Sequence, residues 1–366
     1  MRPLDGLVVL DLTRLLPGAV ATQLLADFGA EVVKVEEPGR GDYGRVMPPL
    51  IDGVGAVFSF VNRGKKSVAL NLKDPAGRDA FLRLAERADV LVEGNRPGVM
   101  QRLGLDYATL RARNERLIYV ALTGYGQDGP YANLAGHDLN YLALGGALDI
   151  TGVRDGPPAI PGVQIADLAG GSMQAVIGIL LALAARTTTG RGQFVDVAML
   201  DGVVSMLPVP LARYAASGRL PQRGNETLSG RYACYNVYQA RDGRWIAVGA
   251  LEPKFWAALC RGLGCERFID EQFAEDPRQR EIIDAVAAVF RTRDAGDWDG
   301  RFRGADACVT IVRNIGEVVA DSHLEAREMI VGGRAGVAPK LSETPGRTSF
   351  EASPRLGEHN DELLSP

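Results

Sequence analysis

Two side chains that can move protons lie in the first half of the chain. His137 is one of only three histidines, and Asp167 opens the glycine-rich run Asp167-Leu168-Ala169-Gly170-Gly171. A neutral imidazole and a carboxylate that converge on one cavity could take a proton from one face of a carbon atom and return one to the other face. A buried histidine that donates to a nearby carboxylate is also a common structural arrangement, so the pair alone leaves both interpretations open.

The sequence around this pair resembles that of the alpha-methylacyl-CoA racemases, which are members of the class III CoA-transferase superfamily. The resemblance extends from Leu4 to His359 and therefore covers essentially the whole chain. Its most specific part is the histidine motif, which separates the racemases from the transferases of the same fold. The motifs that carry it are Ala135-Gly136-His137-Asp138-Leu139-Asn140-Tyr141, Ala166–Met173, Gly190-Arg191-Gly192-Gln193 and Gly249–Phe255.

The resemblance implies a substrate in which a 2-methyl-branched acyl group is held as a coenzyme A thioester. Its alpha proton is only weakly acidic, so inversion needs a base on each face of the carbon and a donor to the enolate oxygen. His137 would act on one face and Asp167 on the other. The expected activity is that of an isomerase which inverts the alpha carbon by two-base 1,1-proton transfer. We expect no metal and no separate cofactor, because coenzyme A is part of the substrate.

Asp167 also admits a purely structural role. An aspartate at the start of a helix most often caps it, which is worth about 1 kcal/mol. The same geometry would present backbone N–H groups and the positive end of the helix to an enolate oxygen. The resemblance makes the backbone N–H of Asp167 the expected donor, and the glycines after it would let the thioester approach the backbone closely.

A second carboxylate is expected beside the imidazole. Glu252 precedes a proline, where glutamate is usually a solvated residue at a helix start. The resemblance implies instead that Glu252 pairs with His137 of a partner subunit, which would fix the tautomer and raise the basicity of the other ring nitrogen. Asp138 either shapes the cavity or caps the helix that Leu139 begins.

Coenzyme A carries a diphosphate and a 3'-phosphate, which need counter-charges. The basic run Arg63-Gly64-Lys65-Lys66 is the first candidate, since the racemases carry a similar run among their substrate contacts. Arg96 follows a predicted strand and is a second phosphate candidate. The complete set of expected substrate contacts is Arg63, Lys65, Lys66, Arg96, Tyr125, Gly136, Asp138, Asn140 and Tyr141.

One departure from the racemase pattern keeps a rival function open. Glu37 stands where many racemases place an arginine, so one phosphate contact is lost or passes to Arg40. In a CoA-transferase, Asp167 would be a nucleophile that forms an acyl anhydride and then an enzyme–CoA thioester. The chain lacks the run of four glycines that some transferases fold over this intermediate, and His137 would then have no role. A third reading is a CoA-thioester-binding protein whose site has decayed.

The elements that must position these side chains are those of an α/β protein. Leu7–Leu12, Glu31–Glu36, Asp89–Glu93 and Leu117–Leu122 are predicted strands, and the helical pattern after Pro17-Gly18 alternates with them. No G-x-G-x-x-G follows the first strand, which disfavours a dinucleotide redox cofactor. A hairpin is predicted around Arg241-Asp242-Gly243.

The expected domains follow from these patterns. We expect a large Rossmann-like parallel-sheet domain over 1–215 that binds coenzyme A, and a smaller α+β domain over 225–320. The resemblance implies that the segment 325–366 returns to the large domain. It also implies an interlocked homodimer whose active site is shared between subunits.

The composition fits a globular protein. The chain of 366 residues is 46% hydrophobic and 23% charged, and its net charge of -4 gives no reason to expect nucleic acid as a partner. Met173–Ala185 is apolar but too short to span a membrane. We expect a cytoplasmic protein, since no signal-peptide pattern is present. The four cysteines are expected to be reduced thiols.

Overall fold

The computed structural model describes residues 1–365, which form two compact units. The large unit holds Met1–Ala147, Pro161–Leu207 and the chain from Ser322 onward; the small unit holds Leu148–Ile160 and Pro208–Asp321. Residues 148–160 and 208–215 therefore lie outside the large domain to which the sequence assigned them. Arg223 accounts for the first of these differences, because its guanidinium donates to the carbonyl oxygens of Asp149 and Gly156.

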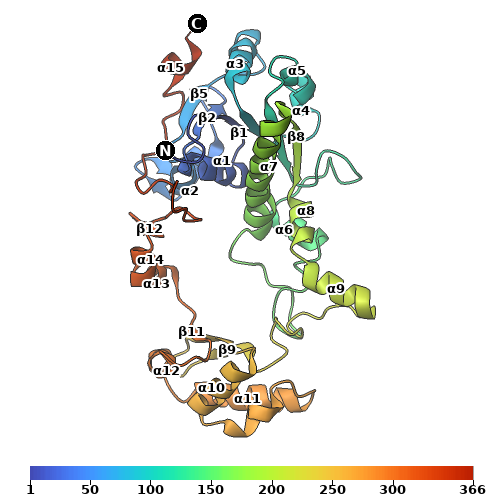
Figure 1. Ribbon diagram of the computed structural model, residues 1–366, viewed down its shortest axis with the longest axis vertical. Helices are drawn as coiled ribbons and strands as arrows, with labels where there is room; N and C mark the ends of the chain where they lie inside the picture. The colour runs from blue at the N-terminus through green and yellow to red at the C-terminus, as the bar shows by residue number, and fades with distance from the viewer. Residues whose placement is uncertain (366) are drawn as a thin grey trace. The chain divides into compact units, whose positions relative to one another are not determined.

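The large unit is built on one sheet of six parallel strands (Figure 1). The strand order is β5-β2-β1-β6-β7-β8, which is the order of a doubly wound sheet. The order reverses between β1 and β6, and ligands of such sheets bind in the crevice at this reversal. The strands are β1 (Val8–Leu12), β2 (Glu31–Glu36), β5 (Lys66–Ala69), β6 (Val90–Glu93), β7 (Ile118–Thr123) and β8 (Phe194–Ala198).

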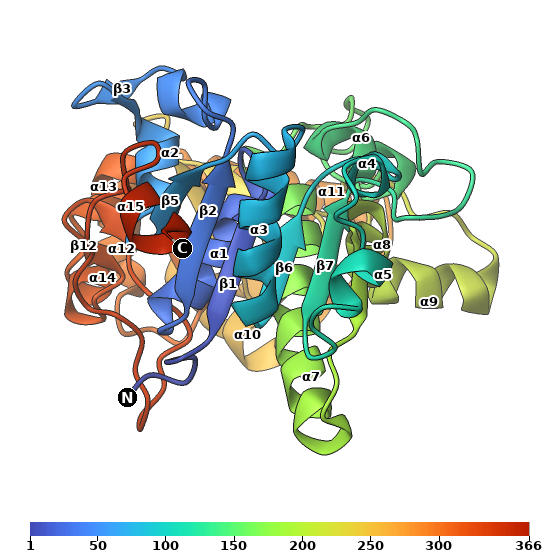
Figure 2. The same ribbon diagram turned by 90° about the horizontal axis from the view of Figure 1, so that it is seen from above.

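Helices cover both faces of this sheet. Figure 2 shows α3 (Pro75–Arg87) in front of the strands and α1 (Pro17–Asp27) behind them. On the α3 face, Leu10, Phe81 and Leu91 are fully buried, and α5 (Tyr107–Arg111) packs into the same core. On the other face, α7 (Gln174–Thr189) packs against α1, β7 and β8. The α/β architecture predicted from the alternating patterns is therefore confirmed.

All four predicted strands are present, with ends that differ by at most one residue. Two further strands, β5 and β8, were not predicted from the sequence. The basic run that includes Lys65 and Lys66 reads as a charged loop, but Lys66 begins β5 and pairs with Val33 of β2. β8 follows Gly192, where a Cβ atom would lie 2.1 Å from the carbonyl oxygen of Leu117, so only glycine lets this segment reach β7.

Asp167 lies inside a helix and not before one. The segment Ala166–Met173 is a π-helix, η2, that continues directly into α7. The glycines after Asp167 therefore form no turn. Gly170 and Gly202 let α8 (Met199–Ser205) approach η2 closely, since a Cβ atom on Gly170 would lie 2.8 Å from the Met199 carbonyl oxygen and one on Gly202 2.2 Å from the Gly170 carbonyl oxygen. The run that the sequence suggested for backbone access is used for helix packing.

The joined helix Ala166–Thr189 is also longer than the apolar segment Met173–Ala185 indicated. This helix has 24 residues, and its most apolar 18-residue window has a mean hydropathy of 1.9, so by length and composition it could cross a bilayer, but one such helix is weak evidence of a span. Ala175, Ile179 and Ala182 are buried in the large unit. About a third of its most apolar window is buried, so much of this apolar helix is exposed in the described structure.

The small unit is an antiparallel sheet covered by helices. Its strand order is β11 (Val309–Ile311), β10 (Trp245–Gly249), β9 (Tyr235–Gln239), and β9 and β10 form the predicted hairpin. Trp256, Phe290 and Trp298 form its core, and both indole N–H groups donate to backbone carbonyls. The covering helices are α10 (Pro253–Leu263), α11 (Arg278–Phe290) and α12 (Ala295–Phe302).

The last residues of the large unit lie along its edge strand β5. The backbone N–H of His359 donates to the carbonyl oxygen of Ser67, and the Asn360 side-chain oxygen accepts from the N–H of Ala69. The other elements of the two units are η1 (Tyr43–Val46), β3 (Leu50–Ile51), β4 (Val54–Gly55), α2 (Ala56–Val61), α4 (Val99–Arg102), α6 (Asp138–Leu144), α9 (Pro208–Ser217), η3 (Glu266–Glu271), α13 (Ile315–Val319), α14 (Ser322–Ala326), β12 (Ile330–Val331), β13 (Arg334–Ala335) and α15 (Asn360–Leu364).

Candidate active site

A cavity of about 1000 Å³ lies in the large unit at the carboxyl ends of β1, β6 and β7. Its wall includes the loop after β1 and the turn after β6, on the two sides of the reversal in strand order. His137 and Asp167 both line it, although they come from different elements. The sheet topology therefore brings together the two side chains that the sequence singled out.

Asp167 sits in an environment that favours its protonated form. Burial raises the pKa of its carboxyl group to about 6, the charge of Asp138 adds to this rise, and His137 opposes it. π-Helical turns are rare and often occur at functional sites. A half-buried carboxyl group that titrates near neutral pH is a suitable acid and base.

The backbone N–H of Asp167 already has an acceptor. It lies in the first turn of the helix, where no intrahelical carbonyl is available, and it donates to Oδ1 of Asp138 at 3.0 Å. Two expectations are therefore wrong for this structure: Asp167 is not a helix cap, and its N–H is not free to meet an enolate oxygen. Asp138 is the capping carboxylate, but it caps the helix of Asp167 and not its own helix α6.

The predicted substrate contacts near His137 also hold its loop in place. The Tyr141 hydroxyl donates to the carbonyl oxygen of Gly136 at 2.6 Å, and the rings of Tyr125 and Tyr141 meet edge to face at 5.1 Å. A Cβ atom on Gly136 would lie 2.6 Å from the Tyr125 hydroxyl oxygen, so glycine is required there. The N–H of His137 donates to Oδ1 of Asn140 at 3.0 Å. The imidazole itself is exposed toward the cavity that it lines.

These predicted contacts divide into two groups by position. Tyr125, Gly136 and Tyr141 line the cavity, whereas Asp138 and Asn140 do not. Burial raises the pKa of Tyr141 to about 12, and Tyr125 and Asp167 add to the rise, so this hydroxyl stays protonated.

Glu252 lies in the small unit, where it is exposed and immediately precedes α10. Its backbone carbonyl accepts from the N–H groups of Phe255 and Trp256. Its predicted pairing with His137 of a partner subunit stays a prediction.

The basic run after α2 is not available to a ligand, because each cation already has a carboxylate partner. Arg63 is 2.8 Å from Asp27 and Lys65 is 3.1 Å from Asp11, and in both pairs the two side chains are buried. Lys66 pairs with Glu31 and Glu362. None of Arg63, Lys65 and Lys66 lines the cavity, and the burial of Arg63 and Lys65 in ion pairs contradicts their assignment as phosphate contacts. Arg63 and Lys65 neutralise buried carboxylates of the fold, whereas Lys66 pairs with two exposed carboxylates.

Other cations take the exposed positions at this edge of the sheet. Arg14 and Arg96 line the main cavity, and Arg14 and Lys73 line an adjoining cavity of about 200 Å³. All three are exposed, and none forms an ion pair within residues 1–365. Arg96 was predicted from the sequence as a phosphate candidate, but Arg14 and Lys73 were not. Their position in the sequence could have indicated them, because each follows the carboxyl end of a parallel strand, as Arg96 does.

Comparisons with known proteins identify the family of this chain. The family described as CoA-transferase family III matches residues 4–360. Human alpha-methylacyl-CoA racemase is 38% identical over 99% of this chain and 92% of its own length. Acetyl-CoA:oxalate CoA-transferase of Acetobacter aceti is 36% identical, over 99% of this chain and 95% of its own. A crystal structure of a CaiB/BaiF family protein from Brucella suis is 31% identical, with a TM-score of 0.88 over 100% of both chains.

The chain therefore belongs to CoA-transferase family III. It is an enzyme of that family, and its substrates are acyl-CoA thioesters.

Replacing Asp138 by asparagine should lower the pKa of the Asp167 carboxyl group from about 6, since the substitution removes a like charge that raises it. The amide oxygen can still accept from the Asp167 N–H, so the helix keeps its cap. A ¹³C NMR titration of the aspartate carboxyl carbons measures the change. Asp106→Asn, which alters the cap of α5, should leave the Asp167 titration in place. An unchanged pKa in the Asp138 variant would contradict the like-charge contact.

Proposed function

We propose that this enzyme is a racemase which inverts the alpha carbon of 2-methyl-branched acyl-CoA thioesters. The observation that carries the proposal is that His137 and Asp167 line one cavity at the reversal of the strand order. A transferase needs only the carboxylate, whereas proton exchange on two faces of one carbon needs a second base. The 38% identity to human alpha-methylacyl-CoA racemase supports the same reading.

In this proposal the two side chains exchange roles with the direction of the reaction. The Asp167 carboxylate takes the alpha proton from one face while the His137 imidazolium gives a proton to the other. In the reverse direction the neutral imidazole takes the proton and the Asp167 carboxylic acid returns it. A pKa of about 6 for Asp167 keeps both of its forms accessible near neutral pH. Glu252 of a partner subunit would orient the imidazole.

Coenzyme A would lie across the two connected cavities. Its phosphates would meet Arg14, Arg96 and Lys73, which are exposed and unpaired within residues 1–365. Arg40, which follows β2 in the chain, is exposed, but it lines neither cavity. Glu37, which lines the smaller cavity, would disfavour an anion beside it.

A second candidate function is transfer of coenzyme A between carboxylic acids. It is favoured by the 36% identity to acetyl-CoA:oxalate CoA-transferase and by Glu37. In this reading the Asp167 carboxylate attacks the thioester carbonyl, releases the CoA thiolate and forms an acyl anhydride. The same carboxylate serves both functions, so the test must separate them by the fate of the alpha proton.

We also propose that the active enzyme is a homodimer, with the exposed face of the α7 helix in the interface. Met173, Ile177 and Leu181 are exposed at helical spacing, and no charged residue occurs between Leu168 and Ala185. The opposite face is fixed in the large unit, where Arg186 pairs with Asp89. A helix anchored along one side cannot be surrounded by lipid, so a second copy of the chain is the occupant that fits this face.

Incubation with a 2-methylacyl-CoA in deuterated water, without a carboxylic acid acceptor, should give deuterium uptake and epimerisation at the alpha carbon. NMR of the alpha position measures both. Asp167→Asn and His137→Gln should each lower the rate of epimerisation by at least ~100-fold, because each removes one of the two bases. If exchange is absent and CoA moves to an added free acid, the enzyme is a transferase instead.

Replacing Arg14 or Lys73 by methionine should raise the KM for acyl-CoA and leave kcat within about twofold, because these cations would contact phosphates far from the reacting carbon. The Arg63→Met variant is the contrast, because the sequence alone suggested Arg63 as a phosphate contact. Loss of the arginine leaves Asp27 buried without its partner, so the thermal stability of this variant should fall. The assignment fails if the KM of the Arg14 and Lys73 variants equals that of the wild type.

Leu181→Lys should convert the dimer to a monomer, because it places a charge in the centre of the apolar face. Light scattering after gel filtration measures the mass. Leu220→Lys is the matched control, since Leu220 is equally exposed but lies in the small unit. A wild-type monomer, or a dimer that survives the Leu181 substitution, would refute the interface; binding of the wild type to lipid vesicles would assign the face to a membrane.

A further inference from the structure

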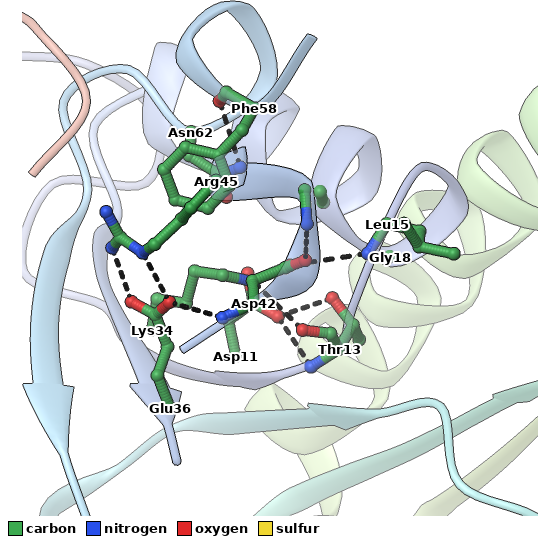
Figure 3. A network of polar contacts seen from close by, with 12 residues as sticks. Asp11, Thr13, Leu15, Gly18, Lys34, Glu36, Asp42, Arg45, Phe58 and Asn62 are labelled. Atoms are coloured by element: carbon green, nitrogen blue, oxygen red, sulfur yellow. Dashed lines mark hydrogen bonds and ion pairs between the residues drawn. The ribbon is translucent and has the colours of Figure 1, made fainter. Parts of the chain in front are cut away.

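Two lysine–aspartate pairs lie buried beneath the cavity, at the carboxyl ends of β1 and β2. Lys34 is 3.1 Å from Asp42 and Lys65 is 3.1 Å from Asp11; the exposed fraction of these side chains is 2% or less. Figure 3 shows Lys34, Asp42 and Asp11 close together below the loop that carries Leu15. Buried ion pairs of this kind add little net stability compared with apolar residues. Besides compensating each other's charge, buried pairs fix one conformation of the chain in some proteins.

The carboxylate of Asp42 joins two separate segments of the chain. Its Oδ2 atom accepts from the backbone N–H of Leu15 at 3.3 Å, and its Oδ1 atom accepts from the N–H of Gly44 at 2.9 Å. The Lys34 ammonium, beside Asp42, also donates to the carbonyl oxygen of Thr13 at 2.9 Å. The dashed lines of Figure 3 trace these contacts around Asp42.

Both of the joined segments are walls of the cavity. Thr13–Gly18 and Asp42–Gly44 line it. Leu15 has a φ of 59°, a left-handed conformation that costs a non-glycine residue roughly 1 kcal/mol and needs an outside contact to persist. The Asp42 carboxylate supplies that contact.

The same loop is connected to the helix of Asp167. The carbonyl oxygen of Pro17 accepts from the Ser172 hydroxyl at 2.6 Å, and that hydroxyl also contacts the carbonyl oxygen of Asp167 at 3.1 Å. The loop after β1 is therefore held by Asp42 at one point and by the π-helix at another. A change at Asp42 would therefore act on a wall of the cavity that Asp167 also lines.

We propose that Asp42, paired with Lys34 in the interior, is a positioning residue that sets the separation of the loop Thr13–Gly18 from the segment Asp42–Gly44 before a coenzyme A thioester binds. The inference rests on the proposed function only for the identity of that ligand. Preorganisation of this kind lowers the free energy that binding spends on ordering loops. The alternative is that the buried pair is only a part of the folded core.

Two double variants separate the tether from the charge. Lys34→Met/Asp42→Asn removes both charges but keeps one side-chain oxygen, which can still accept from the N–H of Leu15, while the amide NH2 group takes the place of the oxygen that accepts from Gly44. Lys34→Met/Asp42→Ala removes the charges and the tether. Both lose the contact of Lys34 with Thr13, so their difference reports the tether alone. Isothermal titration with coenzyme A measures binding without reference to the reaction.

The alanine variant should bind coenzyme A about tenfold more weakly than the asparagine variant, which corresponds to reordering one or two side chains on binding. Equal affinity in the two would overturn the inference. If wild type itself binds no coenzyme A, the proposed function fails instead. Asp89→Asn is the control, since it breaks the Arg186 pair without touching the cavity, and it should leave affinity unchanged.

Hydrogen exchange gives a second measurement that needs no variant. The amides of Leu15 and Gly44 should already be protected in the free wild-type protein, because Asp42 accepts from both. Protection that appears only after coenzyme A is added would mean that the ligand orders the loop, and the inference would be wrong.

Discussion

The reversal of strand order between β1 and β6 is the constraint on which the site depends. Neighbouring strands whose connections leave in opposite directions cannot have their carboxyl ends covered by the same loop, so a crevice remains there. The loop after β1 and the turn after β6 form its walls. His137 and Asp167 come from later segments, but both are delivered to this crevice. The chemistry of the enzyme is possible because the sheet leaves this one edge open.

Close packing of helices then fixes where Asp167 stands. Gly170 and Gly202 allow η2 and α8 to approach at a distance that no larger residue permits. The π-helix leaves the Asp167 N–H without a helical acceptor, and Asp138 fills that role. The same contact places two carboxylates together and helps to raise the pKa of Asp167 to about 6, after burial. Structure and acidity at this residue therefore have a common origin.

The basic residues of the large unit divide into those buried in its interior and those exposed at the edge of the sheet where the cavity lies. Lys34, Arg63 and Lys65 compensate buried carboxylates, because an ion removed from water needs a partner. Cations that follow strand ends, such as Arg14 and Arg96, stay exposed and free for an anionic substrate. The burial of a basic residue, and not its type, decides which of these two roles it has.

The sequence by itself determined the fold class, four of the six parallel strands and the two side chains of the proposed proton-transfer pair, because strand periodicity and the motif around His137 are local signals. It could not place Asp167 within a π-helix, assign Asp138 as its cap or show that Lys65 is buried. Those features depend on which segments meet across the sheet. The tertiary structure decided them, since hydrogen-bond partners and burial are properties of residues far apart in the chain.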